Sequence, residues 1–496
     1  MTKSLLWIAS ALIFVAFLAS SPFVYAAETL VENLPAIRFS ATDHLLFTNA
    51  ENELNPGAPN PNLFLHEAVV RAEVANVSAQ IHFSNRFATN GPTADLPFVL
   101  EKKEVTAEWR DWELRAGDAH HELGKGIALS LYRDDIFGIN HTLEGASLRY
   151  RPEGGEILGF AGRVNPLKNP VALNAVADPL GENTLFLMGT SATLKTSPLA
   201  KLGAHYFIAL NKPPEELIRH FNRYWNTVGA SYSQLEIVPN VDFYAESNLL
   251  LPSRLRGRDY FNEEPGVGTY ASLVWSPSPW AVKLEVKDYR RYDFPFRRPP
   301  TLEENIVEST HNDDTFGTRL ELSHRDIINK SQIQVSYLGG YDRVLGVPIH
   351  HGVLGGKYHE LELSGGYRSL PTHSNLVHGA FKFKFDTFKR QSIELNARKQ
   401  RANLNLSALP TVEDRNKLDL TYTFSRNWTA SVGYEFVPSN PESNQHFANL
   451  GTELKWGALV GKAFVGATSG GTLCSGGVCR RVPPFKGAML ETQYTF

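Results

Sequence analysis

The residues best suited to metal chemistry form one short run, Asp118-Ala119-His120-His121-Glu122. On a β-strand, Asp118, His120 and Glu122 share one face at a spacing of roughly 7 Å, and His121 takes the other face. That spacing is too wide for a single ion unless the strand bends or other segments supply ligands. We therefore expect a polar patch in a lumen or at a strand end rather than a metal site.

The glycines of Gly124-Lys125-Gly126 are of a type found in phosphate-binding loops. The run lacks the Gly-x-x-x-x-Gly-Lys-Ser/Thr spacing and the following helix of a phosphate loop. The sequence also has no Cys-x-x-Cys-His for haem attachment. No nucleotide site and no cofactor are expected.

Cys474 and Cys479 are the two cysteines, and they flank Ser475-Gly476-Gly477-Val478. In an oxidising compartment, two close cysteines around a flexible tetrapeptide predict a disulfide. A redox or metal pair is the alternative, but the spacing is not Cys-x-x-Cys and no histidine stands nearby.

Acidic pairs and histidines that could serve hydrolysis occur at scattered positions, namely Asp134-Asp135, Asp313-Asp314, His311 and His350-His351. Catalysis needs such groups within hydrogen-bond reach of one another. Acidic pairs in loops are usually solvated, and we expect no enzyme.

The elements that must position these residues are β-strands. In the C-terminal half, Leu418, Leu420, Tyr422 and Phe424 alternate with polar residues, and Phe381, Phe383 and Phe385 alternate with Lys382, Lys384 and Asp386. Alternation over about ten residues is typical of transmembrane β-barrels. Strands in soluble sandwiches average about 5–6 residues. The sequence therefore predicts an all-β fold, a transmembrane antiparallel β-barrel.

Five strands are clear, at 381–385, 393–397, 418–424, 428–436 and 487–496. Approximate further strands are 65–75, 77–87, 101–109, 112–118, 124–132, 143–151, 156–165, 185–195, 200–210, 226–236, 239–249, 267–276, 279–290, 316–324, 331–341, 357–367, 446–456 and 458–467. The total is about 23, and bacterial single-chain barrels favour even numbers, so we expect about 22 strands within a range of 20–24.

The connections between these strands leave one difficulty. If the C-terminus is periplasmic, 468–485, 437–445 and 405–415 are outer loops, while 426–427 and 388–391 are periplasmic turns. The stretch 342–356 then becomes a long connection on the periplasmic side. Either a missed strand or an inward-folded segment would explain it.

The N-terminus predicts export. Lys3, the apolar run Leu5 to Leu18 and the small-residue site Val24-Tyr25-Ala26 fit a signal peptide over 1–26 that is cleaved after Ala26. We assign 27–62 to a periplasmic arm or plug segment, although a first strand is also open, and 63–496 to the barrel. The net charge of −3 and mean hydropathy of −0.24 suit a barrel with a wet lumen and argue against nucleic-acid binding.

The last strand ends on Phe496, with Tyr494, Thr492, Leu490 and Ala488 on the same face. It resembles the closing strand of Gram-negative outer-membrane β-barrels. That resemblance implies an outer-membrane location, with Phe496 and Tyr494 as the signal that the barrel-assembly machinery reads. It also implies lipid and lipopolysaccharide as surroundings.

A second resemblance lies in the block from Gly117-Asp118 through Gly124-x-Gly126, Leu129-Ser130-Leu131 and Asp135 to Gly138. It is similar to a segment of uncharacterised Gram-negative outer-membrane barrel proteins and covers some 30 residues. It implies a barrel but brings no known activity. Known barrel enzymes have far fewer strands than the number predicted here.

Transport chemistry would reside on the lumen face. Candidate lumen residues are Lys283, Glu285, Lys287, Arg319, Glu321, Glu360, Glu362, Lys382, Lys384, Asp386, Glu394, Arg398, Lys417, Asp419 and Glu435. Both signs of charge occur, which suits a transverse field or a broadly polar channel. We expect a porin-like channel for passive diffusion of small polar solutes, narrowed by inward loops. The alternative is a sleeve that holds a periplasmic or lumenal partner protein, similar to porin–cytochrome conduits.

Tryptophan placement adds a membrane signature. Most of the mature tryptophans fall at the ends of predicted strands, as in the aromatic girdles of membrane barrels. They are Trp109, Trp112, Trp225, Trp275, Trp280, Trp428 and Trp456.

Overall fold

The computed structural model describes most of the chain from Ile37 to Thr495. The described residues are 37–50, 62–89, 96–134, 139–164, 184–212, 223–254, 265–292, 294, 296, 300, 302, 306–307, 314–343, 346–370, 374–387, 391–404, 411–438, 446–469, 471–475, 478–482 and 485–495. The expected signal peptide over 1–26 and the terminal Phe496 lie outside them.

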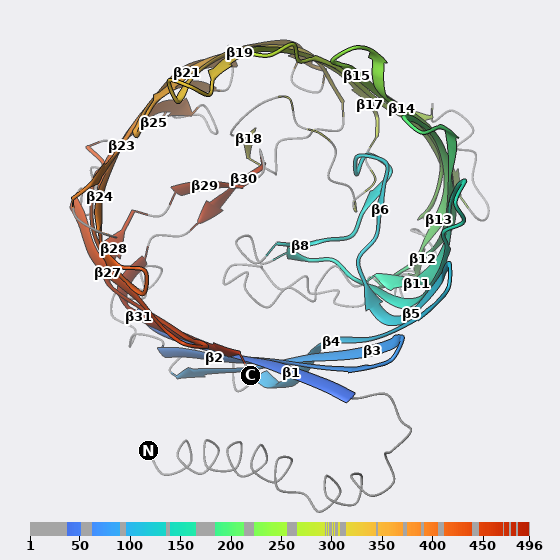
Figure 1. The fold of residues 1–496 in the computed structure, drawn as a ribbon, viewed down its shortest axis with the longest axis horizontal. Helices are drawn as coiled ribbons and strands as arrows, with labels where there is room; N and C mark the ends of the chain where they lie inside the picture. The colour runs from blue at the N-terminus through green and yellow to red at the C-terminus, as the bar shows by residue number, and fades with distance from the viewer. Residues whose placement is uncertain are drawn as a thin grey trace, which may run out of the picture.

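Twenty-four strands form one closed antiparallel sheet, which makes a ring in projection (Figure 1). The first half comprises β1 (Ile37–Ala50), β2 (Asn62–Val74), β3 (Val77–Thr89), β4 (Leu96–Trp109), β5 (Trp112–Ala119), β10 (Leu143–Tyr150), β11 (Gly155–Val164), β12 (Thr184–Ser197), β13 (Ala200–Lys212), β14 (Arg223–Val238), β15 (Val241–Arg254) and β16 (Gly266–Trp275). The second half comprises β17 (Trp280–Arg290), β19 (Thr315–Asp326), β20 (Ser331–Asp342), β21 (Val347–Tyr358), β22 (Leu361–Leu370), β23 (Ser374–Asp386), β24 (Ser392–Leu404), β25 (Thr411–Ser425), β26 (Trp428–Phe436), β27 (His446–Trp456), β28 (Leu459–Thr468) and β31 (Phe485–Thr495).

The barrel closes where β1 pairs with β31, in a register that sets Asp43 opposite Tyr494. Tight turns such as 75–76, 110–111 and 426–427 gather at one end, here called the short-turn end. Both the start of β1 and the end of β31 lie there. The opposite, long-loop end carries longer connections such as 437–445.

Wall strands such as β19 present one apolar and one polar face, as the alternation predicts, whereas the lumen face of β11 carries the buried Leu158, Phe160 and Val164. On β19, Leu320 and Leu322 are exposed on the outer face, whereas Arg319 and Glu321 point into the lumen and pair with each other. On β31 the predicted face of Leu490 and Tyr494 is likewise the outer one. A barrel wall that faces lipid requires apolar side chains on its outer face, because charged side chains placed there destabilise the barrel.

The tryptophans mark the short-turn end. Six lie beside its turns with exposed rings, among them Trp109 at 63% and Trp456 at 78% exposure; the others are Trp112, Trp275, Trp280 and Trp428. This is the arrangement expected for an interfacial girdle. Trp225 is the exception: it lies on β14 near the long-loop end and packs against a buried core inside the ring.

Seven short strands lie inside the outline of the ring (Figure 1). Two small hairpins come from the connection between β5 and β10: β6 (Glu122–Leu123) pairs with β7 (Leu129–Ser130), and β8 (Arg133–Asp134) pairs with β9 (Ile139–Asn140). A third sheet joins β29 (Gly471–Ser475) and β30 (Val478–Val482) with β18 (Ile306–Val307), which runs parallel to β30. Two connections far apart in sequence therefore meet across the ring.

The strand count of 24 lies above the central prediction of 22, at the top of the predicted range. The predicted wall strand 124–132 is wrong, since these residues fold inward as part of the β6–β7 hairpin. The difficult stretch 342–356 hides a missed strand, β21, whose glycines and histidines obscure the alternation. The predicted strand 357–367 is β22, displaced toward the C-terminus.

The predicted arm or plug segment over 27–62 is also wrong in part. Residues Ile37–Ala50 form wall strand β1, which pairs with both β2 and β31. The polar residues Asp43 and His66 stand on the outer face here, bonded to each other at 2.6 Å, and they break the apolar pattern that would have revealed a strand. The barrel therefore begins at Ile37 rather than at residue 63.

Among the described residues, no helix has the length and apolar character needed to span a membrane.

Candidate functional site in the barrel lumen

The chain leaves the barrel wall at Gly117. This glycine has a φ of +108°, and a Cβ atom there would lie 1.9 Å from the carbonyl oxygen of Lys103 on β4. The next residue, Asp118, accepts the backbone N–H of Lys103 at 2.9 Å and the hydroxyl of Thr142 at 3.4 Å. Its carboxylate thus satisfies a donor that β5 no longer pairs, and residues 120–131, here called the inner hairpin, turn into the lumen.

The tip of the inner hairpin is fastened by Glu246 on β15, six strands along the wall from β5, where the hairpin begins. Its carboxylate, 2% exposed, accepts the backbone N–H of Lys125 at 2.7 Å and the hydroxyl of Tyr244 at 2.6 Å. The side-chain amide of Asn248 donates to it at 2.8 Å. A Cβ at Gly124 would meet this carboxylate at 2.1 Å, so the Gly-Lys-Gly run allows a close approach of backbone to wall.

An apolar core fills the space between the inner hairpin and the wall. Ile127 and Leu129 of the hairpin are fully buried, as are Tyr289 and Tyr292 at the end of β17 and after it. The backbone N–H of Ser130 donates to the carbonyl of Phe296 at 2.9 Å, which ties the hairpin to the β17–β19 connection. Because each such side chain contributes about 1.5–3 kcal/mol on burial, this core holds the inner hairpin firmly against one side of the lumen.

Two histidines lie in this inner packing. His121 is 4% exposed, stacks on Phe160, and neither ring nitrogen has a hydrogen-bond partner among the described residues. Burial, followed by the nearby charges of Arg149 and Arg115, lowers the pKa of His121 to about 4. Burial alone lowers the pKa of His141 to about 4 as well. Both rings are therefore neutral at neutral pH.

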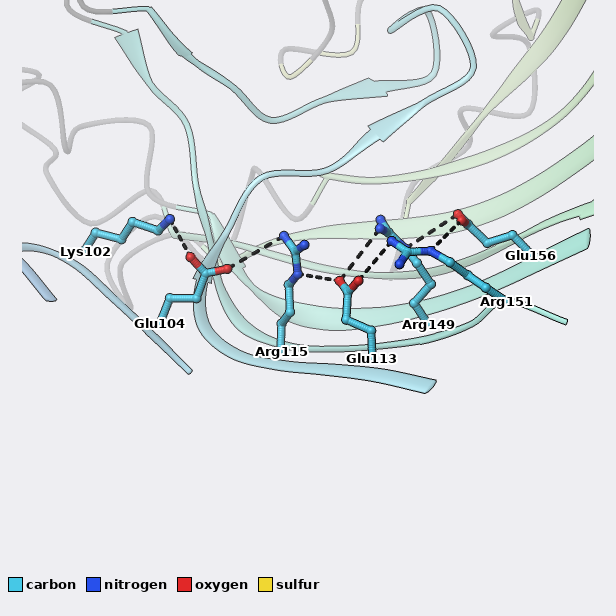
Figure 2. Close-up of polar contacts among 7 residues, drawn as sticks. All are labelled: Lys102, Glu104, Glu113, Arg115, Arg149, Arg151 and Glu156. Atoms are coloured by element: carbon cyan, nitrogen blue, oxygen red, sulfur yellow. Dashed lines mark hydrogen bonds and ion pairs between the residues drawn. The ribbon is translucent and has the colours of Figure 1, made fainter. Parts of the chain in front are cut away.

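A ladder of ion pairs lines the lumen beside the base of the inner hairpin. Figure 2 shows it running from β4 through β5 and β10 to β11, with members Lys102, Glu104, Arg115, Glu113, Arg149, Arg151 and Glu156. Glu113 is its buried centre and contacts Arg115 at 2.5 Å, Arg151 at 2.9 Å and Arg149 at 3.7 Å. Because every arginine here faces a carboxylate, the ladder stiffens the wall and leaves little charge for a solute.

The predicted lumen residues of β17 and β19 come together around Glu285. Its carboxylate contacts Lys283 at 2.9 Å and accepts the hydroxyl of Tyr270 at 2.6 Å. Arg319 lies 4.0 Å from Glu285 and 2.9 Å from Glu321. Lys287 is on the same face but is fully buried beneath the inner core, so it is lumen-directed without contacting lumen water.

The predicted residues on β22–β26 also face the lumen but do not join that cluster. Lys382 pairs with Glu394 at 3.0 Å, and Lys417 pairs with Asp419 at 3.2 Å. Glu435 is buried, contacts Arg415 at 3.5 Å and accepts the hydroxyl of Ser469 at 2.6 Å. The same face of β22–β24 carries Glu362, Lys384, Asp386 and Arg398. Glu360 lies in the turn that precedes β22.

Sequence reasoning missed several residues that line the lumen or hold the inner hairpin. None of the seven ladder residues, nor Glu246, was assigned a lumen role, whereas Asp118 was expected in a polar patch in a lumen or at a strand end and lies at the end of β5. The alternation in 101–109, 112–118 and 143–151 predicted those strands and could have yielded the ladder. No local pattern could have paired Lys125 with Glu246, 121 residues away.

The remaining predicted sites have mixed outcomes. Cys474 and Cys479 face each other directly across the β29–β30 hairpin, a register that suits a disulfide. Their bond stays a prediction. Among the described residues, no group of three or more histidine, cysteine or acidic side chains could hold a metal ion. Among the acidic pairs and histidines considered for hydrolysis, His351 has its Nε2 atom 3.5 Å from Nε2 of His378. Asp135, His311 and Asp313 fall outside the described residues.

On its lumen side, the barrel seam between β1 and β31 is held by contacts between ionisable side chains as well as by backbone pairing. Glu491 of β31 contacts Lys462 at 3.0 Å and His44 of β1 at 3.3 Å, and His44 reaches Glu67 of β2 at 3.3 Å. Tyr494, half of the predicted assembly signal, lies on the outer face beside this seam. Its partner Phe496 lies outside the described residues.

Comparison with known proteins supports the architecture. Residues 361–496 match the model of DUF6029, a family of unknown function, which covers the last barrel strands and less than half of the chain. No curated protein matches the chain. The P pilus tip assembly intermediate PapC-PapD-PapK-PapG of E. coli is similar to this chain in fold, with a TM-score of 0.51 and 8% identity over 93% of this chain and 61% of that one.

Two further solved structures match at lower TM-scores. The translocation pore of the P pilus usher PapC has a TM-score of 0.46 and 9% identity, and OccAB3 of Acinetobacter baumannii has 0.39 and 10%. Both matches cover 93% of this chain and 99% of the other. At such identities the likeness is one of fold alone.

Proposed function

We propose that this protein is a porin-like outer-membrane channel for passive diffusion of small polar solutes, narrowed by its own inner hairpin. The observation that carries the proposal is the docking of the inner hairpin inside the barrel, where the backbone N–H of Lys125 donates to Glu246 of β15. On the remaining wall, charged side chains such as Lys382, Lys384 and Arg398 stay partly exposed in the lumen. A wet, charged passage beside a packed constriction is what a diffusion channel needs.

Barrel size explains why a constriction is needed. Barrels of 16–18 strands already leave an aqueous channel, and 22-stranded ones are plugged. With 24 strands, an empty lumen would pass solutes without selection. The inner hairpin and its apolar core reduce that lumen with residues of the same chain.

The test is conductance of the purified protein in planar bilayers. A porin-like channel gives open, ohmic steps whose size rises with salt concentration. Silent insertions combined with co-purification of a stable partner protein would instead support the sleeve, in which the remaining lumen is filled by that partner. Silent insertions without a partner would refute both readings.

Several expectations accompany this function as part of the proposal. The leader is cleaved after Ala26, and the barrel-assembly machinery reads Tyr494 and Phe496. The mature protein lies in the outer membrane among lipid and lipopolysaccharide, uses no cofactor, carries out no catalysis and binds no nucleic acid. A disulfide joins Cys474 and Cys479, as non-reducing mass spectrometry of the mature chain would show by a loss of about 2 Da relative to the reduced form.

A further inference from the structure

The lumen face of β23–β25 carries more cations than carboxylates among the side chains that the structure describes. The cations, here called the basic arc, are Lys382, Lys384, Arg398, Arg415 and Lys417, and the carboxylates on the same face are Asp386, Glu394 and Asp419. The arc lies on the side of the ring away from the inner hairpin (Figure 1). In this view β29 and β30 lie between the arc and β6 of the inner hairpin, so the arc belongs to a part of the wall that the inner hairpin does not cover.

At the middle of the arc, two cations stand directly opposite each other. The register of β24 and β25 pairs Arg398 with Lys417. Like charges in directly opposed positions of an antiparallel pair lie about 4.5–5.5 Å apart at Cβ and destabilise the sheet. Sheet formation alone gives no reason to place them there.

Nearby carboxylates do not compensate Arg398. Lys417 has Asp419 at 3.2 Å, Lys382 has Glu394 at 3.0 Å and Arg415 has Glu435 at 3.5 Å. No carboxylate among the described residues pairs with Arg398. This differs from the ion-pair ladder of Figure 2, where each arginine has an acidic partner.

The neighbours of Arg398 leave it room for a ligand. In register across β22–β25 the row reads Ser364, Ala380, Arg398, Lys417, so two small side chains stand next to the guanidinium. A guanidinium, an ammonium and a hydroxyl in one row are all donors, which suits an acceptor-only ligand.

We propose that the basic arc is an anion-binding strip, centred on Arg398 and Lys417, that makes the channel select small solutes bearing a carboxylate or phosphate group. The inference rests on the proposed diffusion function and adds its substrate class. The planar guanidinium binds two oxygens of one anionic group, and Lys417 supplies a second charge from the neighbouring strand. Passage then proceeds along the lumen wall past Lys384 and Lys382 without a single tight site.

The test measures reversal potential across a KCl gradient, with inorganic phosphate added afterward as a competitor of the chloride current. The wild-type channel should favour chloride over potassium, and phosphate should reduce the chloride current. In an Arg398→Gln/Lys417→Gln double variant, the ratio of chloride to potassium permeability should fall by at least roughly fivefold, because losing even one of the two charges about 4 Å from the ion has that effect. At 1 M salt the wild-type preference should weaken, because the Debye length shrinks to about 3 Å.

The matched control is Lys455→Gln, which removes one lumen-facing cation from β27, where Lys455 pairs with Glu453 at 3.0 Å. It should leave the permeability ratio nearly unchanged. An open channel that is cation-selective or indifferent, or an equal effect of the control, would refute the anion strip and leave the diffusion function standing. Absence of conductance in the wild-type protein would refute both, and unit conductance of the double variant shows that it has folded.

Discussion

At the scale of single residues, two carboxylates decide where the chain runs. Asp118 satisfies the Lys103 amide at the point where β5 stops, and Glu246 of β15 accepts the backbone N–H of Lys125 in the inner hairpin. Unsatisfied buried N–H groups cost about 1–3 kcal/mol each, so each carboxylate makes one path of the backbone clearly preferable. Gly117 is the third necessary element, since only glycine fits its φ and its contact with the Lys103 carbonyl.

Gly117→Ala should destabilise the barrel by roughly 1–3 kcal/mol, because the new methyl overlaps the Lys103 carbonyl at a positive φ. The measurement is urea-induced unfolding in detergent, read by the mobility shift of heated against unheated samples. Gly154→Ala is the control, since a Cβ at Gly154 meets no atom within 4 Å. Equal stability of the two variants would contradict the role assigned to Gly117.

Acidification should loosen the inner hairpin through His121. The docked ring has a pKa of about 4 against an ordinary value of 6.5, so the undocked hairpin takes up a proton first as the pH falls. Docking is therefore fully favourable above about pH 6.5, weakens as the pH falls to about 4, and changes no further below that. The full difference corresponds to roughly 3 kcal/mol. His141, with the same lowered pKa, acts in the same direction.

The measurement is channel conductance between pH 7 and pH 4, which should rise as the hairpin undocks. His121→Phe keeps a ring against Phe160 and removes the proton site, so much of the acid response should disappear. His359→Gln, in an exposed turn at the short-turn end, should keep it. A conductance that does not change with pH in the wild-type channel would rule out this account.

At the scale of elements, the inner hairpin is an insertion between two neighbouring strands of the barrel wall. It joins β5 to β10, it has its own two-stranded pairing, and its core contacts reach β11, β13 and β17. Strand alternation misassigns it, because a buried hairpin with Ile127, Leu129 and Leu131 in sequence also reads as a strand. Only its contacts distinguish a strand that faces lipid from one that is packed inside.

Weakening the contact between Glu246 and the inner hairpin should widen the channel. In Glu246→Gln the amide NH2 opposes the donors of Lys125, Tyr244 or Asn248, so at least one hydrogen bond is lost, at a cost of roughly 1–3 kcal/mol. Single-channel recordings should show larger or noisier open states. Glu453→Gln, a lumen carboxylate on β27 far from the hairpin, should record like the wild type. Unchanged recordings from both variants would separate the hairpin from the conduction path.

At the scale of the whole molecule, the closed sheet of 24 strands removes every free edge and turns one face of each strand outward. The exposed outer leucines, valines and aromatics then form an apolar surface that Asp43 and His66 interrupt and that tryptophans bound at the short-turn end. A charge introduced on the outer face of a strand should therefore cost much more folding free energy than the same charge introduced on its lumen face.

Leu320→Arg, on the outer face near the middle of β19, should cost about 2–4 kcal/mol in a lipid bilayer. Ser323→Arg, on the lumen face of the same strand, should cost much less because its charge meets water and Glu residues of the lumen. Reversible folding into lipid vesicles measures both. A similar cost for the two variants would contradict the assignment of faces.

The sequence alone determined the fold class, most strand positions and the lumen face of every candidate residue except Glu360, which lies in a turn, because a period of two is a local property of the chain. It left β1 and β21 as one of several readings of 27–62 and 342–356, because an outward polar residue or clustered glycines and histidines break that period.

Only the tertiary structure decided which lumen residues act together. The hairpin tip reaches Glu246 across 121 residues, the ladder joins four strands, and Arg398 is distinguished from other lumen cations by lacking a described acidic partner. Such properties depend on the register between strands and on a chain exit at Gly117, and a pairing between distant strands leaves no periodic trace in either one.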